Sequence, residues 1–169
     1  MEKMARLPAV FKKDGSVTAG NSAGINDGAA ALFLMSEAKA AALGIKPLAR
    51  IRNWASAALD PAYMGLAPIT AVRKVLNAGK LTIDDFGAIE INEAFAVQAI
   101  ACMRELNCTP EKTNLVGSGI SIGHPIGCTG ARILVTLLHI MQRQGNDLGL
   151  ASLCIGGGQS TAMVLENVV

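Results

Sequence analysis

The sequence has no long apolar run and no long run of charges of one sign. Its longest apolar stretches, such as residues 29–35, fall far short of the roughly 20 residues that a membrane-spanning helix requires. The 15 basic and 13 acidic residues are scattered along the chain and leave a formal net charge of +2. This balance indicates no surface for binding nucleic acid. We therefore expect a soluble protein with neither a membrane nor a nucleic acid as partner.

Cysteine is also scarce, and the cysteines do not form pairs in the sequence. The four residues Cys102, Cys108, Cys128 and Cys154 include no Cys-x-x-Cys motif and no histidine cluster, so neither a zinc site nor a disulfide framework is predicted. Residues 1–13 mix charged and apolar positions and lack the continuous apolar region of a secretory signal. We expect reduced thiols, no metal and a cytoplasmic location.

The apolar residues predict one α/β domain. Hydrophobic residues make up 51% of the chain and charged residues 17%, which is enough apolar material for a substantial core. Short strand-like runs alternate with longer stretches of helical spacing. The expected strands are Ala29–Met35, Leu48–Trp54, Ala88–Ile91, Leu115–Val116, Leu150–Ile155 and Thr161–Glu166.

Three stretches of helical spacing should each turn one apolar face toward the sheet. They contain Ile69–Leu76, Phe95–Leu106 and Ile133–Met141, and the first and third run up to Gly79 and Gly145. The last two expected strands are separated by little more than three glycines, which predicts a hairpin and hence an antiparallel pair in a mixed sheet.

Three polar residues fall where loops of an α/β sheet commonly build a site, and each has two interpretations. Asn92 opens Asn-Glu-Ala-Phe and can either cap a helix or take part in chemistry. His124 lies in a loop rich in glycine that would hold its side chain in place, either for a structural role or for proton transfer. His139, within a helical run, is read as structural. Cys154 is either a buried apolar thiol or a base beside glycines whose amides can face an oxyanion.

Several motifs, taken together and in order, resemble the thiolases over nearly the whole chain. They are Val17–Asn21, Asn26–Ala31, Met64–Gly65, Asn92–Phe95, Gly123–Gly127, Gly130–Arg132 and Cys154–Gly158. The resemblance is strongest to biosynthetic acetyl-CoA acetyltransferases. It implies a thiolase-like layered domain with a mixed five-stranded sheet and helices on both faces. It also implies residues 1–28 as a remnant of the CoA-binding loop region and residues 29–169 as the C-terminal catalytic domain.

The resemblance further implies a Claisen condensation of two acetyl-CoA molecules, or the reverse thiolysis, through an acyl-enzyme. His124 would match the histidine that activates the nucleophile and helps to bind a thioester oxygen. Asn92 would match the residue that holds a water in the same oxyanion site. Cys154 would match the cysteine that removes the α-proton, and Gly156 the glycine whose amide contributes to a second oxyanion hole.

Substrate contacts follow from the same resemblance. Met64 and Phe95 would line the acyl pocket. Ser22 stands one place earlier than the serine with which many relatives meet CoA, because this chain has Ala23 at that position. Coenzyme A enters as a thioester substrate, and no separate cofactor is implied.

None of the cysteines lies in a setting that matches the family's acyl-carrying nucleophile, which belongs to an N-terminal half. We therefore expect no transferase activity from this chain alone. The expected partners are acyl-CoA together with either a second copy of the chain or an N-terminal thiolase half. The alternative is a non-catalytic thiolase-fold remnant or interaction module. A related ketoacyl or hydroxymethylglutaryl synthase is disfavoured by Cys154, because those enzymes condense without that base.

Overall fold

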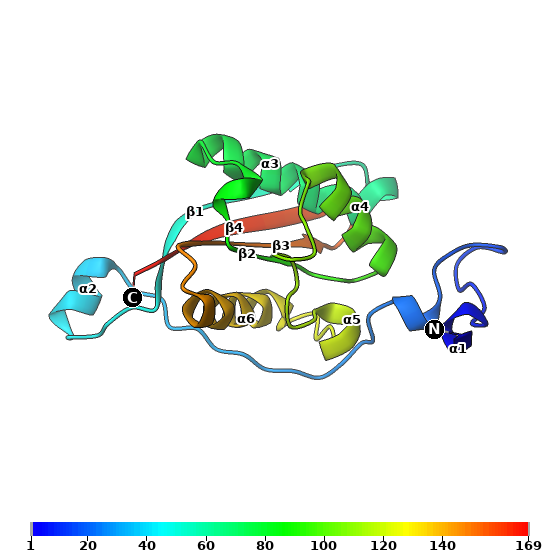
Figure 1. Cartoon of the computed structure of the whole chain (residues 1–169), viewed down its shortest axis with the longest axis horizontal. Helices are drawn as coiled ribbons and strands as arrows, with labels where there is room; N and C mark the ends of the chain where they lie inside the picture. Colours follow the sequence, from blue (N-terminus) through cyan, green and yellow to red (C-terminus); the bar gives the residue numbers. More distant parts are fainter. Residues whose placement is uncertain (1, 169) are drawn as a thin grey trace.

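The computed structural model describes residues 2–168, and a four-stranded sheet lies at its centre (Figure 1). The strands are β1 (Ala49–Ala58), β2 (Ala88–Ile91), β3 (Leu148–Ile155) and β4 (Gln159–Asn167), in the order β1-β4-β3-β2. Strands β2 and β3 run parallel, whereas β4 is antiparallel to both β1 and β3. The expected α/β class and mixed sheet are confirmed, but the described residues form four strands instead of five.

The hairpin between β3 and β4 is confirmed and turns through three glycines. Gly158 has a φ of +106°, and a Cβ at this position would lie 2.5 Å from the carbonyl oxygen of Leu59. The amide of Leu59 donates a hydrogen bond to the Gly158 carbonyl at 3.0 Å, which ties the hairpin to the end of β1. Glycine is needed here because a side chain would face both unfavourable backbone torsions and a backbone clash.

Two expected strands are wrong. Residues 29–35 form no strand; they follow an extended, exposed path past α6, and the Phe33 side chain is 96% exposed (Figure 1). This run begins with three alanines, which favour strands weakly, and it lies beside no sheet edge in the described structure. Residues 115–116 form a turn. There the side-chain amide of Asn114 bonds both the N–H and the C=O of Ile91, at 2.9 Å each, and occupies the edge of β2.

Helices cover both faces of the sheet, as expected. Helices α3 (Ala67–Gly79) and α4 (Ala96–Leu106) lie over one face and α6 (Thr129–Gln144) lies over the other (Figure 1). Two apolar clusters fill the layers, one between the sheet and α3 with α4, the other between the sheet and α6. The three helices correspond to the predicted stretches, and the residue that follows each has left-handed torsions, a common way for a helix to end.

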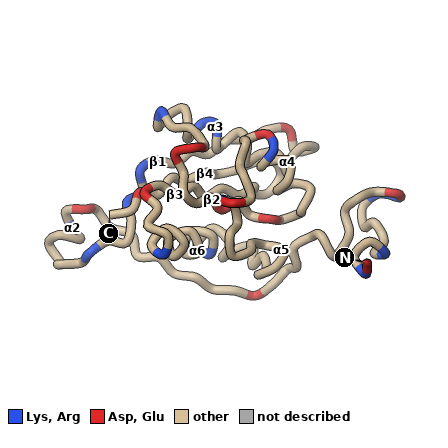
Figure 2. The backbone as a smooth tube through the Cα atoms, in the orientation of Figure 1, with Lys and Arg blue, Asp and Glu red and all other residues tan. Residues whose placement is uncertain are grey.

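The remaining elements are short. They are α1 (Glu2–Ala5), α2 (Glu37–Ala42), α5 (Gly119–Ile122) and the 3₁₀ turns η1 (Ala19–Asn21), η2 (Pro61–Leu66) and η3 (Ile83–Asp85). Helices α1 and α2 lie at opposite ends of the molecule, and charged residues are scattered over the whole backbone (Figure 2). None of the helices among residues 2–168 is long and apolar enough to cross a bilayer.

Phe86 should make a large contribution to stability. Its side chain is fully buried in the cluster beneath α3, whereas Phe33 is 96% exposed. Removing a buried phenylalanine ring typically costs about 3–5 kcal/mol, because apolar contacts are lost and a cavity remains. We expect Phe86→Ala to lower the free energy of unfolding in urea by this amount. The matched variant Phe33→Ala should change it by less than about 0.5 kcal/mol. Equal effects of the two substitutions would contradict the described packing.

Candidate active site

The side chains of β2 alternate between the two layers, and this alternation directs Asn92 toward α6. Ile89 and Ile91 pack in the cluster beneath α3 and α4, whereas Ala88 belongs to the cluster against α6. By the two-residue period of a strand, Glu90 and Asn92 also face α6. Both are fully buried. The end of β2 therefore presents two buried polar side chains to the layer that contains α6.

Asn92 does not cap a helix, so that interpretation is wrong. Helix α4 begins at Ala96, its N-cap residue is Phe95, and no side chain bonds the cap. The backbone N–H of Asn92 instead donates to the carbonyl of Ser152 at 3.0 Å, which extends the pairing of β2 with β3. Its side chain is left to make contacts across the layer.

The loop before α6 holds His124 at several points. Its backbone N–H donates to the carbonyl of Gly24 and to the side-chain oxygen of Asn26, at 3.3 and 3.2 Å. Its ring Nδ1 lies 2.7 Å from the hydroxyl oxygen of Thr129, a buried residue in the first turn of α6. Burial, and then the positive charge of Arg132, lower the pKa of His124 from its usual 6.5. The imidazole is therefore neutral near neutral pH.

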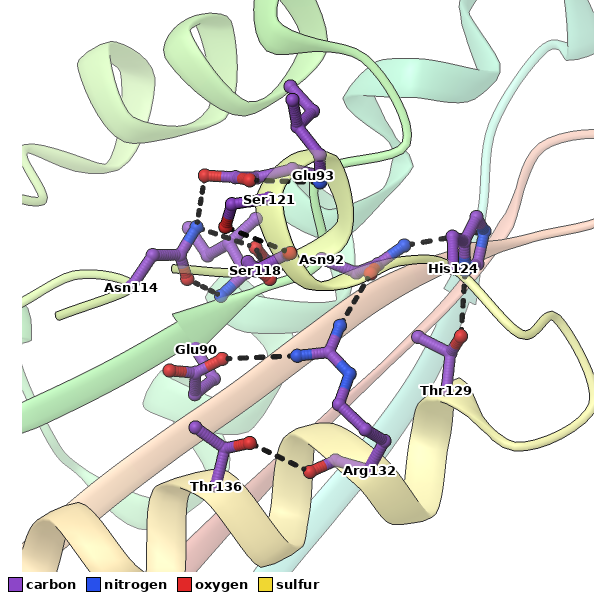
Figure 3. Close-up of polar contacts among 12 residues, drawn as sticks. Glu90, Asn92, Glu93, Asn114, Ser118, Ser121, His124, Thr129, Arg132 and Thr136 are labelled. Carbon is purple, nitrogen blue, oxygen red and sulfur yellow. Dashed lines mark hydrogen bonds and ion pairs between the residues drawn. The ribbon is translucent and has the colours of Figure 1, made fainter. Parts of the chain in front are cut away.

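Asn92 and His124 meet, although 32 positions separate them in the chain. The side-chain nitrogen of Asn92 lies 3.5 Å from Nε2 of His124, at the outer limit of a hydrogen bond (Figure 3). On the other side of the amide, the guanidinium of Arg132 donates to Asn92 Oδ1 at 3.2 Å. Two polar groups thus converge where a substrate oxygen could be stabilised.

Cys154 and Gly156 lie at the same end of the sheet as Asn92. Ile91 and Ser152 are partners in the parallel pairing of β2 with β3, so the chain reaches Cys154 two residues beyond this pair. Cys154 is partly buried, and burial raises the pKa of its thiol. Gly156 follows in the hairpin with a φ of +53° and is exposed. A thiol and glycine amides therefore lie at one end of adjacent parallel strands.

The three expected substrate-binding residues come from separate elements, and the structure brings two of them together. Ser22 forms an isolated antiparallel bridge with Phe95, and its hydroxyl donates to the carbonyl of Thr18 at 2.7 Å. The Phe95 ring also packs edge-on against Phe11, with 5.8 Å between the ring centroids. Met64 lies on η2 and is 42% exposed. Ser22 therefore lies next to Phe95, which follows Asn92 by three residues.

Comparison with known proteins shows that the sequence matches two domain models of one family. The model of the thiolase C-terminal domain matches residues 45–167, and that of the thiolase N-terminal domain matches residues 1–38. The chain belongs to the thiolase family. The thiolase-like fold expected from the resemblance is confirmed.

The most similar thiolases include proteins named acetyl-CoA acetyltransferase. One from Syntrophomonas wolfei is 58% identical over 167 residues, which is 98% of this chain and 42% of the relative. The crystal structure of the Bacillus anthracis acetyl-CoA acetyltransferase is 51% identical with a TM-score of 0.96, covering 99% of this chain and 42% of that one. Human mitochondrial 3-ketoacyl-CoA thiolase in complex with CoA is 37% identical, with a TM-score of 0.92, and the match covers 99% and 43% of the two chains. The chain thus spans about two-fifths of the length of these thiolases.

Two charged residues beside the thiolase site were not singled out in the sequence. Arg132 occurs only as part of the Gly-Ala-Arg motif, and Glu90 only as a member of the strand Ala88–Ile91. Glu90 nevertheless carries a signal, because a carboxylate in a four-residue apolar strand covered on both faces must be buried. Arg132 lies three positions after Thr129 and so on the same face of its helix. Charged residues on the face of β2 that carries Asn92, and on the helix that packs against this face, therefore point to Glu90 and Arg132.

Glu90 should make the stability of this thiolase domain depend on pH. Burial raises the pKa of its carboxyl from 4.5 to about 7, outweighing the opposing effect of Arg132. Between these two pH values the folded state binds more protons than the unfolded state. The free energy of unfolding should therefore fall as pH rises from about 4.5 to 7, with a contribution of up to about 3 kcal/mol.

Glu90→Gln tests this dependence by removing the titrating group. Urea unfolding at several pH values should show a smaller fall in the free energy of unfolding for the variant than for the unmodified chain. Glu105 forms an exposed ion pair with Arg73, so Glu105→Gln is the matched control and should preserve the full fall. A fall in Glu90→Gln as large as in the unmodified chain would contradict the assignment.

Proposed function

We propose that this chain supplies the acid–base and oxyanion-binding part of an acetyl-CoA C-acetyltransferase. The reaction is the Claisen condensation of two acetyl-CoA molecules to acetoacetyl-CoA, or the reverse thiolysis. The observation that carries the proposal is the contact of Asn92 with His124 at the end of β2, beside the strand that bears Cys154. The names and similarity of the relatives support the same chemistry.

In this proposal Cys154 is the base of the condensation. Cys154 first gives its thiol proton to the CoA thiolate that leaves in acyl transfer. The resulting thiolate takes a proton from the α-carbon of the second acetyl-CoA, and the electron pair moves to the thioester oxygen as an enolate. A water held by Asn92 and the Nε2–H of His124, which by this stage carries the proton taken from the acyl-accepting cysteine, stabilise that oxygen. A weak carbon acid loses its proton only if the developing charge is met by hydrogen bonds. The enolate carbon then attacks an acyl-cysteine; a carbon–carbon bond forms, the carbon–sulfur bond breaks, and the cysteine leaves as thiolate.

His124 and Gly156 serve the acyl-transfer half of the same proposal. His124 takes the proton of the acyl-accepting cysteine, which an unprotonated Nε2 can do. The amide of Gly156, in an exposed turn with no side chain in the way, contributes to the oxyanion hole around the acyl-cysteine. The hydroxyl of Ser22 and the side chains of Met64 and Phe95 contact the CoA thioester, which is substrate; no further cofactor is assigned.

We also infer how the chain is divided and what completes it. Residues 1–28 contribute to the CoA-binding loop region, and residues 29–169 form the catalytic domain. An N-terminal thiolase half supplies the acyl-carrying cysteine, and copies of the chain associate as an oligomer. Large exposed apolar side chains support association: Phe33, Ile25 and Trp54 are 96%, 88% and 66% exposed. Light scattering after size-exclusion chromatography would test it, and a dilute monodisperse monomer would argue against it.

A cytoplasmic location and a role in fatty acid metabolism complete the proposal. All four cysteines are free, which suits a reducing compartment. Acetyl-CoA and acetoacetyl-CoA are fatty-acyl metabolites of the shortest chain lengths, so the proposed reaction belongs to that metabolism.

Complementation tests the proposed function. The purified chain is mixed with acetyl-CoA, with and without a separately produced thiolase N-terminal half, and release of free CoA is followed together with formation of acetoacetyl-CoA. We expect activity only in the mixture. Absence of activity in both samples, with both proteins folded, would favour the alternative of a non-catalytic thiolase-fold remnant or interaction module.

A further inference from the structure

Arg132 lies between the Asn92 side chain, which contacts His124, and the buried carboxylate of Glu90. It projects from α6 toward the end of β2, and its side chain is 13% exposed (Figure 3). One terminal nitrogen donates to Asn92 Oδ1 at 3.2 Å, and the other lies 3.9 Å from a carboxylate oxygen of the fully buried Glu90. A planar guanidinium with donors on both sides suits this position, because it can face two acceptors at once.

The contact with Arg132 decides how the amide of Asn92 is oriented. A primary amide has nearly the same shape after a half turn, so packing alone does not distinguish its oxygen from its nitrogen. Arg132 carries donors and no acceptor, and only the amide oxygen can bond it. The amide nitrogen of Asn92 must then face Nε2 of His124, which lies 3.5 Å away.

The orientation of Asn92 in turn selects the protonation of the imidazole. Facing an N–H donor, Nε2 of a neutral His124 acts as acceptor, and the ring proton belongs on Nδ1. Nδ1 lies 2.7 Å from the hydroxyl oxygen of Thr129, and that hydroxyl donates onward to the carbonyl of Pro125 at 3.0 Å. The hydrogen bonds thus run in one direction, from the Arg132 guanidinium through Asn92 to Nε2, and from Nδ1 through Thr129 to the carbonyl of Pro125. The opposite tautomer would set two N–H groups against each other at Nε2, and the Thr129 hydroxyl would have to rotate away from the Pro125 carbonyl to donate to Nδ1.

We propose that Arg132 is a positioning residue that fixes the tautomer of His124 through the amide of Asn92. Its meaning for catalysis rests on the proposed function, since Nε2 must be unprotonated to accept the proton of an acyl-accepting cysteine. The titratable groups around the guanidinium are Glu90 on β2, Glu93 on the following loop and Cys128 at the start of α6. The Glu93 carboxylate is itself bound by the Asn114 side chain and the Ile120 amide, at 3.2 and 3.3 Å.

The tautomer can be read directly in the chain by nuclear magnetic resonance. The two histidines are His124 and His139. His139 is exposed, so in the same spectrum it reports the tautomer ratio of an imidazole in contact with solvent. Long-range proton–nitrogen spectra of the histidine-labelled chain at about pH 8, where imidazole is neutral, should show His124 with its proton on Nδ1. In Arg132→Met and Arg132→Gln the ratio of the Nδ1–H to the Nε2–H form should fall about tenfold, the size of one lost hydrogen bond.

Controls separate positioning from charge and from misfolding. Arg73→Gln removes an exposed arginine and should leave the spectrum of His124 unchanged. A role of Arg132 through charge alone would raise the pKa of His124 in both variants while the tautomer ratio stayed as in the unmodified chain, and this result would overturn the proposal. The backbone amide spectrum shows whether Arg132→Met and Arg132→Gln are folded. One folded variant is sufficient to test the tautomer ratio. Because no turnover is measured, an unchanged tautomer would leave the proposed function standing, and failed complementation would leave this inference standing.

Discussion

Cys154→Ala is expected to lower the exchange of the α-protons of acetyl-CoA by roughly 10²–10⁴-fold, the range typical of a general base. The exchange is measured as deuterium uptake by acetyl-CoA when the chain is mixed with an N-terminal thiolase half in deuterated buffer. The physical reason is that Cys154, two residues beyond the Ile91 and Ser152 pair at the end of β3, is the proposed acceptor of the α-proton. The raised pKa of the Cys154 thiol, caused by burial, strengthens its thiolate as a base once formed.

Cys108→Ala is the matched control for that experiment. Cys108 is a buried cysteine that belongs to the apolar cluster beneath α3 and α4, and burial raises the pKa of its thiol to about 11. Its removal should change stability slightly and exchange by less than about twofold, because its thiol packs in the apolar cluster and has no role in the proposed chemistry. Comparable losses in the two variants would mean that Cys154 acts through packing and not as a base.

His124→Ala should have a comparably large effect on acyl transfer. Loss of the imidazole removes both the base for the acyl-accepting cysteine and a donor to the thioester oxygen, so release of CoA from acetyl-CoA should fall by roughly 10²–10⁴-fold in the complemented enzyme. His139→Ala removes the exposed histidine of α6 and should leave the rate unchanged. Equal rates for His124→Ala and the unmodified chain would exclude the proposed role.

The pH profile of the same reaction provides a second readout. A histidine acts as base only when neutral, so activity should be lost as pH falls through its pKa. Burial and the charge of Arg132 hold the pKa of His124 below its usual 6.5. The midpoint of the acidic limb should therefore lie below about 6.5, and His124→Ala should abolish this limb.

Much of the fold could be predicted because it depends on local periodicity. Apolar residues at helical spacing identified α3, α4 and α6, and the three glycines before Gln159 identified the β3–β4 hairpin. The failures were two short apolar runs, residues 29–35 and 115–116. A strand exists only if another backbone pairs with it, and a run of apolar residues carries no information about whether a partner edge is present.

The candidate site divides in the same way between local and long-range information. The sequence by itself determined which residues could do chemistry, because Asn92, His124 and Cys154 stand at strand ends or in glycine-rich turns whatever the rest of the chain does. Only the tertiary structure decided that Asn92 faces His124 and not the start of α4. It also decided that Arg132 and Glu90 lie behind this pair. These contacts join β2, the loop before α6 and α6 itself, and they arise only when the helix packs on the sheet and water is excluded from the charges between them.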